Sequence, residues 1–321
     1  GKTDLDTLAI GVAGTLATGS SGGGDSGSSS SDFIFTGQGS VAVNDVENQV
    51  RAVIGAGSLV RSGNTLTVTA VDDSDIDADA GGAAIAIQSG GDDPSLTIGA
   101  SIAVNAIDST VRAALIDSNT VARLATIAAT ASPEISALTL AGAVGVGTGG
   151  GTAFGGAGSG SGNVINTVTE ALVSGGQFTT NNGALTLTAT DNSVINADAG
   201  SAAIQIVTGG SNSANAIAIG AAAARNDITS TTRAAVSGAT VSVAGAVSLT
   251  ATYGAEIDAF TFAVAGAVSA GNGSGLALAG AGSGSGNFIT ATTEAEIVGS
   301  TVTSTIGNMS LSATDNSSIS A

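Results

Sequence analysis

Four aspartates in the segment 73–79 are the residues best placed to bind a metal ion. Asp73, Asp75, Asp77 and Asp79 alternate with other residues, so on an extended strand their carboxylates project from one face. Carboxylate oxygens are ligands that Ca²⁺ prefers, and calcium is therefore the candidate cofactor. The alternative is a solvated acidic face that keeps a strand edge from pairing with another chain. We favour this alternative because the equivalent stretch near Asp198 carries fewer carboxylates.

The chain offers little for catalysis. It contains no His and no Cys, which excludes imidazole proton shuttles, thiolate nucleophiles and the usual zinc and copper ligands. Paired carboxylates such as Asp72 and Asp73 could do acid/base work on a polysaccharide. A catalytic site is a singular feature, however, and the acidic residues here occupy repeated positions. We predict no catalytic residue and no enzyme, with a carbohydrate-active β-helix or a calcium-dependent surface module as the alternative function.

An asparagine with the same neighbours recurs five times along the chain. Successive anchors lie 61 (105−44), 58 (163−105), 63 (226−163) and 61 (287−226) residues apart. A Val or Ile stands two residues after each anchor, an Ala eight after, and an aliphatic residue ten after. Such self-similarity is the signature of a stacked array, in which each unit buries its apolar face against its neighbours. We expect a ladder of side-chain amides built by Asn44, Asn105, Asn163, Asn226 and Asn287.

The residue seven places after each anchor is charged. In chain order these residues are Arg51, Arg112, Glu170, Arg233 and Glu294. Adjacent units are therefore expected to pair Arg112 with Glu170, and Arg233 with both glutamates. Exposed pairs contribute roughly 0 to 1 kcal/mol each, so they would fix the register more than they stabilise the array.

The units are of two alternating types, so the full period spans two units, 119 (163−44) or 121 (226−105) residues. Type 1 continues into acidic stretches such as 76–81, and type 2 into long apolar runs. Both ends of the chain match the middle of a unit, so we expect a window on a longer array. The expected units are 1–43 (the second half of a unit), 44–104 (type 1), 105–162 (type 2), 163–225 (type 1), 226–286 (type 2) and 287–321 (part of type 1).

Alternation of apolar and polar residues, rich in Val, Ile and Thr, predicts the strands that must position these residues. No stretch has a helical apolar period with caps, so the chain is predicted to be all-β. The favoured architecture is a repetitive β-solenoid, a rod like a parallel β-helix. The alternatives are a long-strand antiparallel β-sheet and a two-layer β repeat.

Corners are expected where Gly and Ser are concentrated, at 19–31, 89–93, 149–162, 209–213 and 271–275. The residues nine places before each anchor support this expectation, because an odd separation puts them on the opposite face of an uninterrupted strand. A corner or bulge between them and the anchor would return all of them to one interior. These residues are Phe35, Leu96, Phe154, Ile217 and Leu278.

The apolar runs 135–146 and 257–268 are apolar on both faces of an extended strand. A strand that faces water on one side does not normally show this pattern. We favour a second layer within the unit as its explanation. The alternative is a hydrophobic stripe that docks neighbouring filaments, with candidate lateral-contact residues Phe260, Phe262, Val264, Leu138 and Leu140.

The bulk composition narrows the class of protein. Hydrophobic residues make up 43% of the chain and aromatics only 2%, with 49 Gly among 321 residues, which predicts thin layers that approach closely. The net charge of −18, with only seven Lys and Arg, disfavours nucleic acid as a partner. No apolar stretch reaches the length of a transmembrane helix.

The repeated pattern also resembles a known class of proteins. Its residues are Asn-x-Ile with Thr-rich spacing to an Ala, then Leu-Thr-Ala-Thr-Asp-Asn-Ser (187–193) and Ala-Asp-Ala-Gly (197–200). It is similar to the repeat regions of giant bacterial surface proteins, including leukotoxin-like and haemagglutinin-like filamentous adhesins, over nearly the whole chain. The resemblance implies a secreted, cell-surface β-solenoid used as a stalk, fibre, tubule or adhesive. Its expected partners are neighbouring repeats or filaments, a cell-surface polysaccharide, or another cell.

Overall fold

The computed structural model describes residues 1–18, 33–209 and 212–321. Within them the chain forms twenty strands and no helix, so the all-β prediction is confirmed. No helix in this part of the chain could span a membrane. The strands build one ten-stranded sheet, one long five-stranded sheet and one short five-stranded sheet. Every pair of strands described is parallel, so the antiparallel alternative is wrong.

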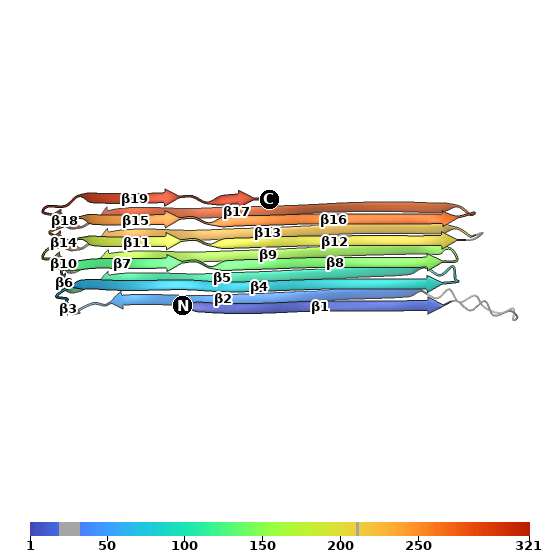
Figure 1. Ribbon diagram of the computed structural model, residues 1–321, viewed down its shortest axis with the longest axis horizontal. Coiled ribbons are helices and arrows are strands. Elements are labelled where there is room, and N and C mark those ends of the chain that lie inside the picture. The colour runs from blue at the N-terminus through green and yellow to red at the C-terminus, as the bar shows by residue number, and fades with distance from the viewer. Residues whose placement is uncertain (19–32, 210–211) are drawn as a thin grey trace.

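The chain visits the three sheets in the same order again and again, and we call each round a pass (Figure 1). The first strand, β1 (Lys2–Thr18), belongs to the ten-stranded sheet. The long five-stranded sheet holds β2 (Ile34–Ile54), β5 (Ser95–Ile116), β9 (Gly151–Ser174), β13 (Ala214–Ser237) and β17 (Gly275–Val298). The short five-stranded sheet holds β3 (Leu59–Arg61), β6 (Asn119–Ala122), β10 (Gln177–Thr180), β14 (Thr240–Val243) and β18 (Thr301–Ser304).

Each pass ends in the ten-stranded sheet. In the first full pass a single long strand does so, β4 (Thr65–Ser89), whereas later passes use two consecutive strands. The first of these two strands stacks in the same row as the first half of β4. The strands of this row are β7 (Leu124–Ala131), β11 (Leu185–Asp191), β15 (Val247–Tyr253) and β19 (Met309–Asp315). The second strand continues the other half: β8 (Glu134–Thr148), β12 (Val194–Gly209), β16 (Glu256–Gly271) and β20 (Ser318–Ser320).

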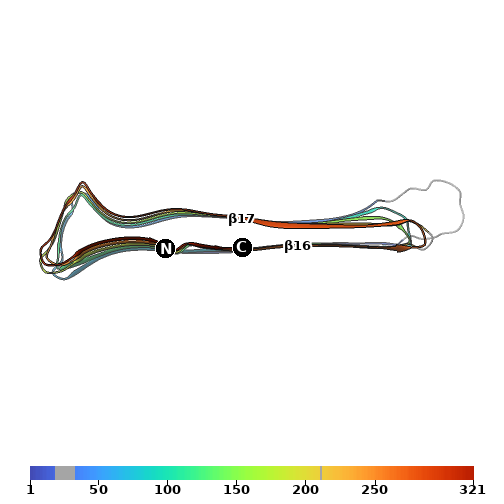
Figure 2. The ribbon, with the colours of Figure 1, turned by 90° about the horizontal axis from the view of Figure 1, so that it is seen from above.

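Seen from above, the passes lie over one another, because each strand pairs with its equivalent in the next pass (Figure 2). The long five-stranded sheet and the ten-stranded sheet form two facing layers, and the short sheet lies at one end. Residues at equivalent positions of successive passes therefore form columns along the stacking direction. We call the direction in which the passes stack the stacking axis.

The interior changes character along the strands. Toward the short sheet it holds large side chains, among them Ile127, Phe178 and Leu187, and the middle is filled by columns of isoleucine. Beyond them the interior consists of small residues, mainly alanine, glycine and serine, together with Thr97 and Gln205. There the two layers approach so closely that a Cβ on Gly99 would lie 2.0 Å from the carbonyl oxygen of Gly142. A nearly aromatic-free composition is what these thin layers require.

The expectation of a corner or bulge before each anchor is wrong. Phe35 and Asn44 lie on the same uninterrupted strand, β2, and equivalent strands carry the other four pairs. Side chains on a strand alternate between its faces, so an odd separation directs Phe35 outward, where it is 57% exposed. The interior is built mainly from residues an even number of places from the anchor.

The Gly- and Ser-rich stretches are only partly corners. Stretches 89–93 and 271–275 connect strands as predicted, whereas most of 149–162 lies within β9. In β9 Ser159 and Ser161 lie on the buried face, and Gly158, Gly160 and Gly162 alternate with them on the outer face, so the stretch is a regular strand. The corner itself needs only Gly149 and Gly150, which have φ of 124° and 114°. The predicted corner at 19–31, and residues 210–211 of the corner at 209–213, lie outside the described residues.

Candidate functional site: an asparagine column and an exposed apolar face

The five anchor asparagines form one column of the long five-stranded sheet. Each Nδ2 donates to the Oδ1 of the next anchor, at 2.8, 2.8, 2.8 and 2.7 Å from Asn44 to Asn287. At one end Thr7 Oγ1 donates to Asn44 Oδ1 over 2.6 Å. Asn105, Asn163 and Asn226 are fully buried, where an unpaired amide would cost about 1–3 kcal/mol. The column therefore satisfies each amide through its two neighbours.

A second buried polar column, which the sequence reasoning missed, faces the interior from the ten-stranded sheet. Its register is Asp72, Ala131, Asp191, Tyr253 and Asp315. Asp191 is fully buried and accepts hydrogen bonds from Thr167, Ser230 and Ser193, while Asp72 accepts from Ser74 over 2.8 Å and from Ser109. Burial, with Asp191 and Asp315 alongside, raises the pKa of Tyr253. The signal was the recurring Asp two residues before Ser, at 72–74, 191–193 and 315–317.

The charged column is more irregular than its sequence. Arg112 pairs with Glu170, with 2.7 Å between Nε and Oε2. Arg233 lies in register with both Glu170 and Glu294, but its Nε donates to Glu296 over 2.6 Å and lies 3.6 Å from Glu294. Glu296 stands two residues after Glu294 and therefore on the same face of the strand.

The candidate lateral-contact residues lie on the outer face of the ten-stranded sheet, where no other described part of the chain covers them. Leu138 and Leu140 project from β8, and Phe260, Phe262 and Val264 from β16, with Phe260 62% exposed. The interpretation of the apolar runs as a second layer within the unit is therefore wrong. One phase of each run is core and the other is surface.

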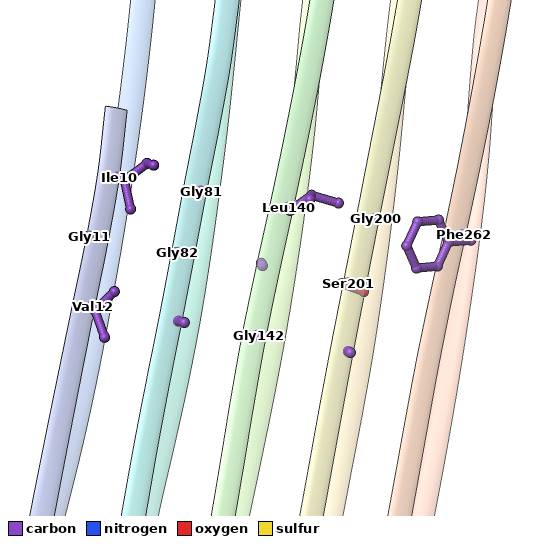
Figure 3. A pocket seen from close by; sticks show the side chains of 13 residues that line it. Ile10, Gly11, Val12, Gly81, Gly82, Leu140, Gly142, Gly200, Ser201 and Phe262 are labelled. Atoms are coloured by element: carbon purple, nitrogen blue, oxygen red, sulfur yellow. The ribbon is translucent and has the colours of Figure 1, made fainter. Parts of the chain in front are cut away.

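These residues belong to a larger surface, which we call the apolar face. It comprises the outward residues of β1, β4, β8, β12 and β16 in five adjacent columns, named by their β1 members: Leu8, Ile10, Val12, Gly14 and Leu16. The Leu8 column is the edge of this face, because its members on β4 and β12 are the carboxylates Asp79 and Asp198. Large side chains and glycine alternate along its Ile10 column. The Ile10 column continues as Gly81, Leu140, Gly200 and Phe262, around an open hollow of about 390 Å³ (Figure 3).

The sequence of the Ile10 column explains the relief of the apolar face. The Phe262 ring leans over Gly200, where a Cβ would lie 2.3 Å from the ring and 2.9 Å from Leu140 (Figure 3). At Gly81 the nearest atom to such a Cβ would be Ile10 Cγ1, at 3.8 Å. The alternation follows the two types of unit, because the large residues come from β8 and β16 and the glycines from β4 and β12.

The four aspartates proposed as calcium ligands all point outward from β4, beside the apolar face. With other carboxylates on neighbouring strands they form what we call the acidic band: Asp4, Asp6, Asp73, Asp75, Asp77, Asp79, Glu134, Asp198, Glu256 and Asp258. Burial raises the pKa of Asp75, and the neighbouring charges of Glu134, Asp77 and Asp4 raise it further. Among the described residues no three or more such side chains gather into a group that could hold a metal ion.

Comparison with known proteins adds nothing to the register, the buried columns or the apolar face. A search of protein-family models, of curated proteins and of solved structures finds no match to this chain.

Proposed function

We propose that this chain is a non-enzymatic structural segment of an extracellular fibre, tubule or filamentous adhesin, and that each pass is one coil of a β-solenoid rod. The observation that carries the proposal is the asparagine column, which keeps one register through five strands. The side-chain amides of the three inner asparagines bond to their equivalents in the neighbouring coils, so the same contact serves any number of coils. Asp and Glu outnumber Lys and Arg by 25 to 7, and this excess of negative charge favours solubility outside the cell.

Stacking of structurally equivalent coils gives such a rod its stability. Backbone hydrogen bonds run along the stacking axis between equivalent strands, and each coil contacts only its neighbours. The stability of such an array is close to a sum of coil and interface contributions. A rod can therefore be lengthened without any new kind of contact.

The rod would be a ribbon in cross-section. Neighbouring strands lie about 4.8 Å apart, so each coil adds about 4.8 Å of length. The strand β4 has 25 residues and runs across this axis. At about 3.3 Å per residue it gives the ribbon a width of roughly 80 Å.

The register of the last strand shows how the chain can be extended in order to test the proposal. Ala321 follows Ser320, which aligns with Asp258 and through it with Asn196, so residue 321 occupies the column of Ala197. A second copy of residues 198–321 appended after Ala321 would continue both the register and the alternation of the two unit types. One such copy adds two coils, and a series with one to six copies should form rods about 10 Å longer per copy at constant cross-section. Small-angle scattering and electron microscopy measure both quantities.

The matched control begins the appended copy at residue 199, one residue later. A slip of one residue turns every side chain to the other face of its strand, so these chains should not extend the rod. Rods that fail to lengthen in the in-register series, or a chain that depolymerises an acidic polysaccharide, would overturn the proposal.

A further inference from the structure

The apolar face is a continuous surface in the middle of the array. Ile85 and Ile87 of β4, Leu138 and Leu140 of β8, and Ile204 of β12 are each about two-fifths exposed, although neighbouring strands flank them on both sides. Within the part of the chain that the structure describes, nothing covers them. Contiguous apolar surface of this kind marks an interaction site.

The apolar face is complementary in shape to a second copy of itself. The Ile10 column reads Ile10, Gly81, Leu140, Gly200 and Phe262, and the Gly14 column, two places further along, reads Gly14, Ile85, Val144, Ile204 and Gly266. In four of the five strands, a large residue in one column stands on the same strand as a glycine in the other column. The central strand β8 is the exception, because it has a large residue in both columns. Between them, the Val12 column has only small residues in its three inner strands, Ala83, Gly142 and Ala202.

A half-turn about the stacking axis through the Val12 column brings these two columns face to face. Gly81 then receives Ile85 of a second copy, Ile10 meets its Gly14, and Gly200 receives its Ile204. Phe262 meets Gly266 of the second copy, where a Cβ would have no neighbour within 4 Å. The Phe262 ring leaves Gly200 by a change of rotamer, which is common where surfaces meet. The small residues of the Val12 column lie at the axis.

The positions of the acidic residues also favour the half-turn about the stacking axis. The acidic band flanks one edge of the apolar face, beginning at the column of Leu8 and Asp79. The half-turn about the stacking axis reverses the strand direction and places the two bands at opposite edges of the interface. A half-turn about the strand direction would instead bring the two bands face to face, which like charges disfavour.

The area is that of a stable dimer. The apolar face extends over residues 8–16 of β1 and their partners on four further strands. At about 3.3 Å per residue and 4.8 Å per strand it covers roughly 700 Å² per copy. Twice this value lies within the roughly 1,200–2,000 Å² that specific interfaces bury.

We propose that a second copy of this chain docks on the apolar face by a half-turn about the stacking axis, so that the large residues of each copy fill the glycine positions of the other. The closed two-fold symmetry uses the same surface on both copies. The inference deepens the proposed function and rests on it in one respect, that the interface grows with the number of coils.

The first test compares the two outer surfaces of the ribbon by sedimentation velocity. Leu140→Asp places a charge at the centre of the apolar face and should raise the dimer dissociation constant about tenfold or more. Ile102→Asp is the matched control on the outer face of the long sheet, since Leu140 is 43% and Ile102 47% exposed. It should change the constant by less than about twofold. Monomeric wild-type chain, or equal weakening by both substitutions, would overturn the proposal.

The second test exchanges a large residue with its glycine. Gly81→Ile fills the position that receives Ile85 of the second copy and should weaken the dimer, whereas the double variant Gly81→Ile, Ile85→Gly restores the match and should recover it. Gly156→Ile on the opposite outer surface, where a Cβ meets nothing within 4 Å, should have no effect. A double variant that dimerises no better than Gly81→Ile alone would contradict the pairing.

Two further readings separate the arrangements. Salt should strengthen the dimer only modestly, because the acidic bands lie apart and screening acts on the overall repulsion between two copies of net charge −18. A dimer that strengthens by orders of magnitude between low and high salt has the bands face to face, and the orientation is then wrong. The face substitutions leave the strand register untouched, so the appended-copy rods should lengthen normally. A failure of docking is therefore distinguishable from a failure of the rod.

Discussion

At the scale of single residues, the anchor asparagines are satisfied mainly by equivalent residues of other passes, and Asp72 and Asp191 by hydroxyl groups of nearby strands. Asn163 accepts from Asn105 and donates to Asn226. Asp191 is held by hydroxyl groups from both layers. A buried polar group costs little only when all its partners are present, so each column ties neighbouring passes to one register.

Replacing Asn163 by Ala should therefore destabilise the protein more than the loss of one contact. It leaves Asn105 Nδ2 without an acceptor and Asn226 Oδ1 without a donor, both buried. The expected decrease in the free energy of unfolding is about 2–4 kcal/mol. Urea denaturation would measure it, with Asn166→Ala as the control, because Asn166 lies exposed on the same strand. Equal losses for the two variants would show that the column contributes nothing special.

The acidic band should make stability depend on pH through Asp75. Burial and then Glu134 raise the pKa of Asp75 above its ordinary value of 3.8. The folded protein thus binds this proton more tightly than the unfolded chain, and the group costs stability as pH rises from about 3.8 through the raised pKa. Asp75→Asn should raise the melting temperature at pH 7 and have no such benefit at pH 3. A variant with the same melting temperature as the parent chain at pH 7 would contradict this account.

At the scale of the strands, the glycines separate into two groups with opposite roles. Gly82 and Gly99 face the other layer, and a Cβ on either would lie within 2.3 Å of a carbonyl oxygen opposite. Gly156 faces solvent with open space around it. The thin half of the molecule exists because glycine stands at the first kind of position.

This difference predicts opposite effects of the same substitution. Gly99→Ala forces the two layers apart and should lower the free energy of unfolding by about 1–3 kcal/mol. Gly156→Ala restricts the unfolded chain without a clash and should be neutral or stabilise by up to about 1 kcal/mol. Thermal unfolding of the two variants side by side measures both effects. A Gly99→Ala variant as stable as the parent chain would mean that the layers separate freely.

Alternation and repetition in the sequence were enough to predict strands, a stacked array and a common register for Asn105 and its equivalents. They were not enough to place Phe154, because the Gly/Ser stretch beside it looks like a corner in composition and is a strand in the structure. Nor could they separate Asp191 from Asp75, since burial of a carboxylate depends on hydroxyl groups some 24 or 39 residues away in sequence. The pattern of residues in one segment predicts a strand. Which face of that strand is buried depends on the other strands that pack against it.

At the scale of the whole molecule, both unit types contribute to two different surfaces that lie beside each other, the acidic band and the apolar face. The carboxylates of the acidic band project side by side from neighbouring strands and do not converge on a point. We therefore expect an excess of chelator to leave the β circular dichroism spectrum and the melting temperature unchanged. A loss of the β signal on chelation would establish a calcium-dependent module instead.

The flat cross-section also determines how much mass each unit of length along the stacking axis requires. A chain of 30.0 kDa rises through only five or six strands along the stacking axis. At about 4.8 Å per strand this is roughly 1 kDa for every ångström of rod. A fibre one micrometre long would need about two thousand coils, or more than a hundred thousand residues, at this spacing. Fibres of that length must be assembled from many chains joined end to end, and mass-per-length measurements should find each of them heavy for its length.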